Sequence, residues 1–129
     1  MRACKDVPRG DHEGGGTWIS DELVDAYVRL HELGFAHSVE CWQAGELVGG
    51  IYGVSLGGFF AGESMFHRAT NASKVALCHL VGHLRSRGFA LFDIQMITPA
   101  TRQLGAVEIP REEYLRRLGA AVQLNCAFN

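Results

Sequence analysis

Three polar side chains stand inside segments that otherwise have the composition of hydrophobic strands. Glu63 lies in the run Phe59–Phe66, and Asp93 and Gln95 lie in the run Phe89–Ile97. A carboxylate that is buried without a partner costs on the order of several kcal/mol, or it changes its protonation state. These three residues are therefore the first candidates for chemistry in this chain.

Alternation along a strand predicts which residues accompany them. It groups Glu63 with Phe59, Ala61 and Met65 on one face, and Asp93 and Gln95 with Leu91 on another. One interpretation is structural, because edge strands and sheet ends often carry solvated or networked carboxylates. The apolar companions favour the other interpretation, a cleft with an apolar wall and an acidic group suited to holding an amine.

Three other motifs fail on inspection. The run Gly53–Gly57 matches G-x-S-x-G, but a further strand rather than a helix is expected after it, and no His follows Asp93. His79 and His83 have a spacing that can hold a metal, yet the H-E-x-x-H glutamate is absent, so two solvent-side histidines are the better interpretation. No glycine cluster continues into G-K-[ST], so a P-loop is excluded.

The elements that must position these residues follow from periodicity, caps and breakers. In chain order we expect a helix capped by Ser20 and ended by Gly34, strands Ser38–Gln43, Leu47–Val54 and Phe59–Phe66, a helix capped by Asn71 and ended by Gly88, the strand Phe89–Ile97, a short helix from Thr98-Pro99 to Gly105, and a helix Arg111–Leu118 after Pro110. The short connections among the first three strands predict an antiparallel meander. The fold class is α/β, with a largely antiparallel sheet flanked by helices.

Composition narrows the function classes. The 129 residues have 47% hydrophobic and 20% charged side chains and a net charge of −2, which is typical of a globular domain and not of a duplex-DNA binder. No apolar run is long enough for a membrane span, and the N-terminus has no signal-peptide core. The four cysteines form no C-x-x-C pair. We expect a cytoplasmic monomer, with residues 1–16 as a polar, glycine-rich tail and residues 17–129 as one domain.

An ordered series of short segments resembles one known family. The segments are Thr17-Trp18-Ile19, His37-Ser38-Val39-Glu40, Leu47-Val48-Gly49-Gly50-Ile51-Tyr52-Gly53, Gly62-Glu63-Ser64-Met65-Phe66, Asn71-Ala72-Ser73-Lys74, Asp93-Ile94-Gln95 and Leu104-Gly105-Ala106. In this order they resemble the bacterial leucyl/phenylalanyl-tRNA–protein transferases, from about Thr17 to Leu118. The resemblance implies an acetyltransferase-like (GNAT) fold.

The resemblance also implies an activity. Family members transfer Leu or Phe, and less well Met, from aminoacyl-tRNA to proteins with N-terminal Arg or Lys, which marks them for N-end rule degradation. Neither a metal nor any cofactor such as acetyl-CoA is required. The family also has a smaller N-terminal domain, and we expect this chain to begin after it.

Site residues are carried over from the family by position. Asp93 and Gln95 match the catalytic pair, and Glu63 matches the acidic residue that faces the acceptor protein's N-terminus. The aminoacyl pocket positions are Ile51, Met65, Leu77, Leu80, Leu84 and Phe92, although core packing also explains the helical spacing of the three leucines. The tRNA-binding positions are Trp18, Tyr27, Arg68, Lys74 and Arg111, where aromatic stacking and phosphate contacts are expected.

Two other functions stay open. A non-catalytic module that grips basic N-termini would use Glu63 and Asp93 but would not need Gln95. Another GNAT-type acyltransferase would need a glycine-rich pyrophosphate loop, and the run from His67 to Ala72 contains no glycine. The second alternative is the weaker one.

Overall fold

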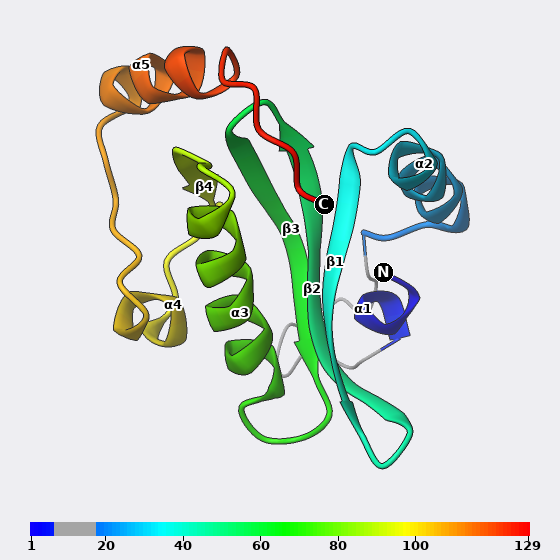
Figure 1. The fold of residues 1–129 in the computed structure, drawn as a ribbon. Coiled ribbons are helices and arrows are strands. Elements are labelled where there is room, and N and C mark those ends of the chain that lie inside the picture. Colours follow the sequence, from blue (N-terminus) through cyan, green and yellow to red (C-terminus); the bar gives the residue numbers. More distant parts are fainter. Residues whose placement is uncertain (7–17) are drawn as a thin grey trace.

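The computed structural model describes residues 1–6 and 18–129. Its elements are α1 (Arg2–Asp6), α2 (Asp21–Glu32), β1 (Ala36–Gln43), β2 (Glu46–Leu56), β3 (Phe59–His67), α3 (Ala72–Ser86), β4 (Leu91–Asp93), α4 (Pro99–Gln103) and α5 (Arg111–Ala121). The strands form one sheet in the order β1-β2-β3-β4 (Figure 1). The expected mixed α/β fold with a largely antiparallel sheet is therefore confirmed. Among the described residues, no helix is long and apolar enough to cross a membrane.

The connection between β3 and β4 differs from the others. β1, β2 and β3 pair antiparallel through short turns, whereas β4 pairs parallel to β3, with Ala61 opposite Asp93 at its end. A parallel pair needs a crossover, and α3 provides it. The sheet edge at β4 is thus built by the longest connection in the domain, and this edge carries Asp93.

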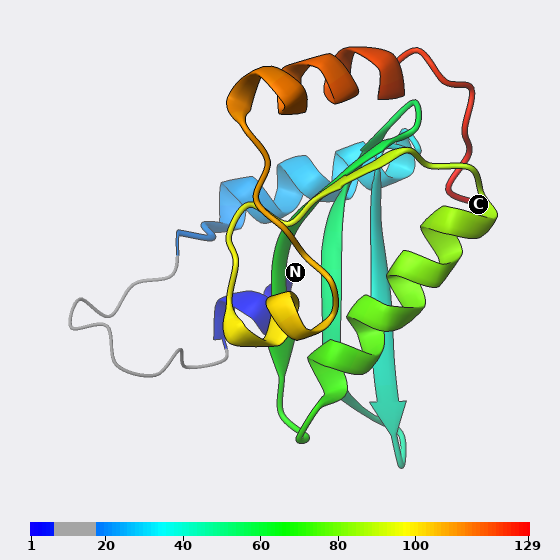
Figure 2. The same ribbon diagram turned by 90° about the vertical axis from the view of Figure 1, so that its left-hand side faces the viewer.

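Two apolar clusters lie on opposite faces of the sheet. On one face, α3 packs on Ile51 of β2 and Phe60 of β3. On the other, α1 and α2 pack on Tyr52 of β2 and Phe66 of β3. Figure 1 shows the sheet nearly edge-on, with α3 on one side and α1 and α2 on the other. Figure 2 shows α5 lying across one end of this sheet.

Several local signals predicted from the sequence are confirmed. The Ser20 hydroxyl caps α2 by accepting a hydrogen bond from the Leu23 amide at 3.2 Å. Thr98 and Thr101 form a reciprocal capping box on α4, with Pro99 in its first turn. Asn71 precedes α3 as expected, but it has a φ of 64° and its side chain makes no capping hydrogen bond.

The N-terminal segment differs from the expectation. Residues 2–6 form α1, and Cys4 is only 2% exposed within the cluster that contains Ile19 and Val24. The prediction that residues 1–16 form a polar tail is therefore wrong for this helix. A single helical turn is too short to give a periodic signal, and its burial depends on the distant sheet. The rest of the predicted tail, residues 7–16, lies outside the described residues.

The strand that carries Asp93 is shorter than expected. β4 ends at Asp93 instead of continuing to Ile97, because the backbone N–H of Gln95 donates a hydrogen bond of 2.7 Å to Asp93 Oδ1. This side-chain-to-backbone bond competes with a sheet ladder and turns the chain. Gln95 has a φ of 66°, so the prediction that Asp93 and Gln95 alternate along one strand is wrong.

A bulge interrupts β3 at Glu63. Tyr52 pairs with Ser64 and Gly53 pairs with Gly62, which leaves Glu63 as an extra residue. As a result Phe60 and Met65, five residues apart, both pack toward α3. In the predicted grouping of Glu63 with Phe59, Ala61 and Met65, the placement of Met65 is wrong, because a bulge reverses the face of every residue beyond it.

A substitution at Gly53, which lies opposite the bulge on β2, tests the packing of β2 against β3. A Cβ there would lie 2.1 Å from the Ala61 carbonyl oxygen and 2.5 Å from the Phe60 ring. We expect Gly53→Ala to lower the free energy of unfolding by about 3 kcal/mol, the upper range for overpacking. In contrast, Gly82→Ala on α3, with nothing within 4 Å, should raise it by about 0.5–1 kcal/mol. Urea denaturation measures both, and equal stability of the two variants would contradict the packing at Gly53.

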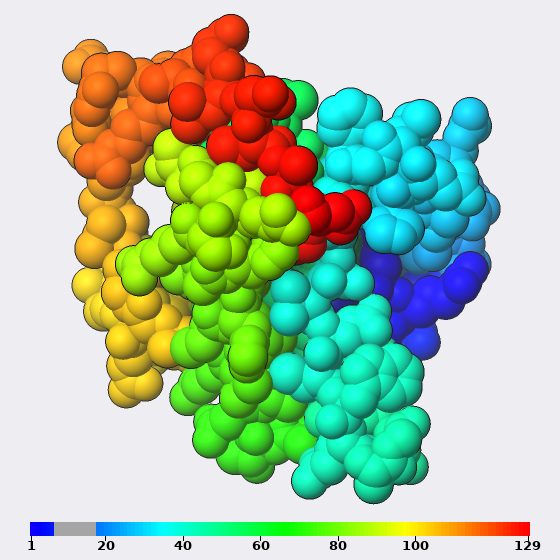
Figure 3. All heavy atoms as spheres, in the orientation of Figure 1, coloured from blue at the N-terminus to red at the C-terminus, as the bar shows by residue number. Residues whose placement is uncertain are grey.

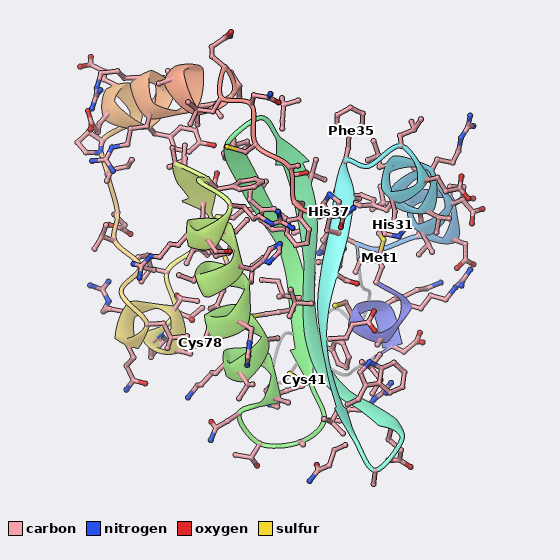
Figure 4. The ribbon with its side chains drawn as sticks, viewed as in Figure 1. Met1, His31, Phe35, His37, Cys41 and Cys78 are labelled. Carbon is pink, nitrogen blue, oxygen red and sulfur yellow. The ribbon has the colours of Figure 1, made fainter. Side chains whose placement is uncertain are left out.

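The C-terminal residues 125–129 close the face that α3 covers. The Phe128 ring stacks on His37 with centroids 4.1 Å apart and lies 5.6 Å from Phe60. A ring nitrogen of His83 hydrogen-bonds the Phe128 carbonyl oxygen. Figure 4 shows His37 on β1 beside His31 of α2. The sequence places His83 on the solvent side with His79, and that is wrong for His83, because the C-terminal segment covers it.

Candidate active site

The candidate site lies at the sheet edge where β4 ends. Beyond Asp93, β3 continues through Gly62 and Glu63 without a strand beside it on this edge. The residues that follow β4 run along this open stretch. The Gln95 side chain donates a 3.1 Å hydrogen bond to the Gly62 carbonyl oxygen, which gives an otherwise open edge group a partner.

The orientation of the Gln95 amide is fixed by its neighbours. Its Nε2 donates to the Gly62 carbonyl oxygen and also lies 3.4 Å from Glu63 Oε2. Both neighbours are acceptors, so the nitrogen end must face them. The amide oxygen therefore points away from the sheet edge. Within the described residues that oxygen has no hydrogen-bond donor, which leaves it able to accept one from a ligand.

Both oxygens of Asp93 are engaged. Oδ1 accepts a hydrogen bond from the backbone N–H of Gln95 at 2.7 Å, and Oδ2 accepts one from the Tyr114 hydroxyl at 2.7 Å. The same interaction raises the pKa of Tyr114 to about 12, mainly through the hydrogen bond to Asp93. The phenol therefore remains a donor at neutral pH, and the carboxylate is held from two sides.

Tyr114 is a residue that sequence reasoning missed. It lies in α5, 21 residues after Asp93, in a helix whose sequence shows only a modest apolar side. A tyrosine among charged residues on such a helix resembles an ordinary surface aromatic. No local pattern indicates that its hydroxyl meets the end of β4.

Glu63 connects this cluster to the opposite face of the sheet. The bulge directs it toward Tyr27 of α2, whose pKa is raised to about 12 by burial and then by the charge of Glu63 and a hydrogen bond to it. Tyr27 in turn packs edge-on against Tyr52, with centroids 5.5 Å apart. A continuous polar chain thus runs from Tyr27 through Glu63, Gln95 and Asp93 to Tyr114.

A cleft of about 940 Å³ opens beside this chain. Its floor is apolar and includes Leu77, Val81 and Phe92, while Asp93, Gln95 and Tyr114 supply its polar side. The segment between α4 and α5 forms the far wall. Figure 3 shows the hollow between this orange segment and the green α3. An apolar floor with a few convergent polar groups is the usual form of a ligand site.

Comparison with known proteins shows the family to which the chain belongs. The sequence profile of the leucyl/phenylalanyl-tRNA protein transferase family matches residues 1–119. The chain belongs to this family. It is 54% identical over 128 residues to the leucyl/phenylalanyl-tRNA–protein transferase of Chlorobium luteolum, covering 99% of this chain and 64% of that protein. It is 60% identical over 106 residues to the transferase of Ruegeria pomeroyi, covering 82% of this chain and 50% of that protein.

The chain spans about half to two-thirds of the length of the relatives that it matches. A further relative, the transferase of Nitrosospira multiformis, is 58% identical over 118 residues, which cover 92% of this chain and half of that protein. The matched part contains every residue of the polar chain described above.

The residues that the family resemblance assigns to an aminoacyl pocket lie together. Ile51, Leu77, Leu80 and Leu84 are buried in the cluster under α3, and Met65 and Phe92 pack against it. Of these six, Leu77 and Phe92 also line the cleft beside Asp93. The burial of the others is accounted for by the core between α3 and the sheet.

The residues that the resemblance to the transferase family assigns to tRNA are dispersed. Arg68 donates to the Leu47 carbonyl oxygen at 3.1 Å and lies over the Phe66 ring. Lys74 is in the first turn of α3, whereas Arg111 begins α5 and lines the cleft. Figure 1 places these two helix starts at opposite ends of the sheet. The three cations therefore do not form one patch.

The two aromatic tRNA positions differ in exposure. Trp18, which precedes α2, is 51% exposed, so its ring is available for stacking. Tyr27 is half-buried between Tyr52 and Glu63.

In the described residues, no group of three or more His, Cys, Asp or Glu side chains is arranged to hold a metal ion.

Proposed function

We propose that this chain transfers Leu or Phe, and less well Met, from an aminoacyl-tRNA to the N-terminal Arg or Lys of an acceptor protein. The observation that carries the proposal is the fixed Gln95 amide, whose oxygen faces outward beside an apolar cleft while its nitrogen is held at Glu63. Membership of the transferase family supports it. The parallel β3–β4 pair supports an acetyltransferase-like fold, and a cytoplasmic role in N-end rule degradation belongs to the same proposal.

The reaction needs an amine acceptor and a carbonyl centre brought into contact. The acceptor's neutral α-amine attacks the ester carbonyl carbon of the aminoacyl-tRNA, forming the new C–N bond. The bond from that carbon to the ribose oxygen then breaks, and the proton lost by the amine is transferred to the leaving ribose oxygen, which becomes a hydroxyl. The Gln95 oxygen accepts a hydrogen bond from the amine and orients its lone pair. Because an ester is already activated, positioning supplies much of the acceleration.

The two carboxylates, Glu63 and Asp93, have different roles in this proposal. Glu63 attracts the cationic side chain of the N-terminal Arg or Lys, with a charge-assisted pair as the expected contact. Asp93 holds the Gln95 backbone through Oδ1 and places negative charge near the amine as it becomes positive during attack. Leu77 and Phe92 provide an apolar surface for the Leu or Phe side chain.

The test is a transfer assay with this chain. Radiolabelled Leu-tRNA and Phe-tRNA are incubated with a protein that has N-terminal Arg, and label in acid-precipitable protein is counted after deacylation of the tRNA. We expect transfer to N-terminal Arg and none to the same protein with an acetylated N-terminus. A matched acceptor with N-terminal Gly should be labelled much more slowly.

A negative result has a specific alternative. If the chain binds a peptide with N-terminal Arg but transfers no label, the non-catalytic binding module is the better description, and the proposed function is overturned. Stabilisation of the chain by acetyl-CoA in a thermal melt would favour the other GNAT-type acyltransferase.

A further inference from the structure

Tyr114 donates a hydrogen bond to the carboxylate of Asp93. The Tyr114 hydroxyl, on α5, lies 2.7 Å from Asp93 Oδ2, whereas Asp93 Oδ1 accepts a hydrogen bond from the backbone N–H of Gln95. A carboxylate with one donor can rotate about χ2, but one held at both oxygens cannot do so without losing a bond. The Tyr114 hydroxyl therefore selects one orientation of Asp93.

The position of α5 is itself defined by the sheet. The Gly58 amide in the β2–β3 turn donates a 2.7 Å hydrogen bond to the Ala121 carbonyl oxygen at the end of α5. Gly57 has a φ of 57°, and a Cβ there would lie 2.4 Å from the Val122 carbonyl oxygen. This close approach fixes the C-terminal end of the helix, and Tyr114 attaches its first half to β4.

The Asp93 orientation is transmitted to Gln95. Asp93 Oδ1 holds the backbone of Gln95 at a positive φ, a conformation that costs energy for a residue with a side chain. That backbone aims the amide at Gly62 and Glu63. Rotation of Asp93 would release the turn and move the amide oxygen away from the cleft.

We infer that Tyr114 is a positioning residue for the transfer reaction, acting through Asp93 on Gln95. The inference rests on the proposed function, because it assigns Tyr114 to the same site. The hydroxyl is engaged with Asp93 Oδ2 and keeps the Asp93–Gln95 pair in one arrangement. The ring of Tyr114 also lines the cleft, so the positioning role is tested by removing the oxygen atom alone.

The first experiment tests the hydrogen bond without any transfer. Tyrosine ring carbons are ¹³C-labelled, the Tyr114 signal is assigned by its loss in Tyr114→Phe, and the signals are followed as pH rises. We expect Tyr114 to titrate near pH 12 in the wild type and at a clearly lower pH in Asp93→Asn, where burial is the remaining cause of a raised pKa. Tyr27, which responds to burial and Glu63, should be unchanged by Asp93→Asn. An unchanged Tyr114 titration would overturn the inference.

The second experiment tests the consequence for transfer. Tyr114→Phe should lower kcat by about 10- to 100-fold, the factor that one hydrogen bond to a charged group is worth. The KM for aminoacyl-tRNA and for the acceptor should stay within about twofold, because the hydroxyl binds neither. The matched control is Glu112→Gln on the exposed first turn of α5, which should leave kcat unchanged.

The outcomes separate this inference from the proposed function. Wild-type transfer with an undiminished kcat in Tyr114→Phe overturns the positioning role and leaves the proposed function standing. A fall in kcat accompanied by a large loss of melting temperature would show that the Tyr114 hydroxyl stabilises the fold, and it would overturn the positioning role. If the wild type transfers nothing, the proposed function fails, and the titration still shows whether the Tyr114–Asp93 contact exists.

Discussion

Asp93→Asn is expected to lower the rate of aminoacyl transfer by about 10²- to 10³-fold, while the protein remains folded. Losses of this size are typical when a single preorganised polar group is removed from a site. Radiolabelled Phe-tRNA and an acceptor with N-terminal Arg provide the measurement, with enzyme in excess so that one turnover is observed. Single-turnover conditions separate the transfer step from product release.

The expected loss follows from the two contacts of the Asp93 carboxylate. Asp93 Oδ1 accepts a hydrogen bond from the backbone N–H of Gln95, and Asp93 Oδ2 accepts one from the Tyr114 hydroxyl. The Asp93 side chain therefore provides two acceptors. Asn offers one acceptor and one NH₂ group, which would face either an N–H or an O–H donor. The substitution therefore removes the negative charge beside the attacking amine, and the Tyr114 hydroxyl can keep its contact only by accepting a hydrogen bond from the Asn NH₂ instead of donating one.

The fold has little dependence on this charge. Asp93 is the last residue of a three-residue strand and is half-buried, so the melting temperature should change by only a few degrees. Asp25→Asn on the exposed side of α2 is a matched control that removes the same charge far from the site. A transfer rate within about threefold of the wild type in Asp93→Asn would contradict the assigned role of the pair.

Much of the fold could be predicted because its signals are local. The Ser20 cap, the Thr98-Pro99 helix start and the short turns among the first three strands depend on residues within a few positions of one another. Asp93, Gln95 and Glu63 could be singled out because polar residues in apolar strands conflict with the hydrophobic pattern. These observations did not require any knowledge of which elements meet in space.

The arrangement of the site could not be predicted because it depends on non-local contacts. The bulge at Glu63 changes the face of the strand, and alternation has no means to anticipate an extra residue. The end of β4 is set by a side-chain hydrogen bond to the backbone of Gln95. Tyr114 reaches Asp93 only because α5 lies across the end of the sheet, which Figure 2 shows and the sequence of α5 does not indicate.

Glu63→Gln is expected to weaken recognition of cationic N-termini more than it weakens the reaction itself. Gln keeps the size of the side chain and an oxygen that can accept from Gln95 Nε2 and Tyr27. It removes the negative charge. The kcat/KM for an acceptor peptide with N-terminal Arg should fall by about 10-fold or more, mainly through KM, since the lost contact is charge-assisted.

A neutral analogue of Arg isolates the charge from the shape. Citrulline replaces the guanidinium by a urea group of nearly the same size, so a peptide with N-terminal citrulline cannot form the charged pair with Glu63. The wild type should prefer Arg over citrulline, and Glu63→Gln should reduce or remove that preference. Rates for both peptides, measured with the same aminoacyl-tRNA, give the comparison directly.

The control is Glu46→Gln, which removes an equal charge from the exposed first residue of β2, away from the Asp93 edge of the sheet. It should preserve the wild-type preference for Arg. The informative contrary result is an equal loss for Arg and citrulline in Glu63→Gln. Glu63 would then act by holding the Gln95 amide, whose Nε2 it contacts at 3.4 Å, and the acceptor's positive charge would have to be recognised by another group.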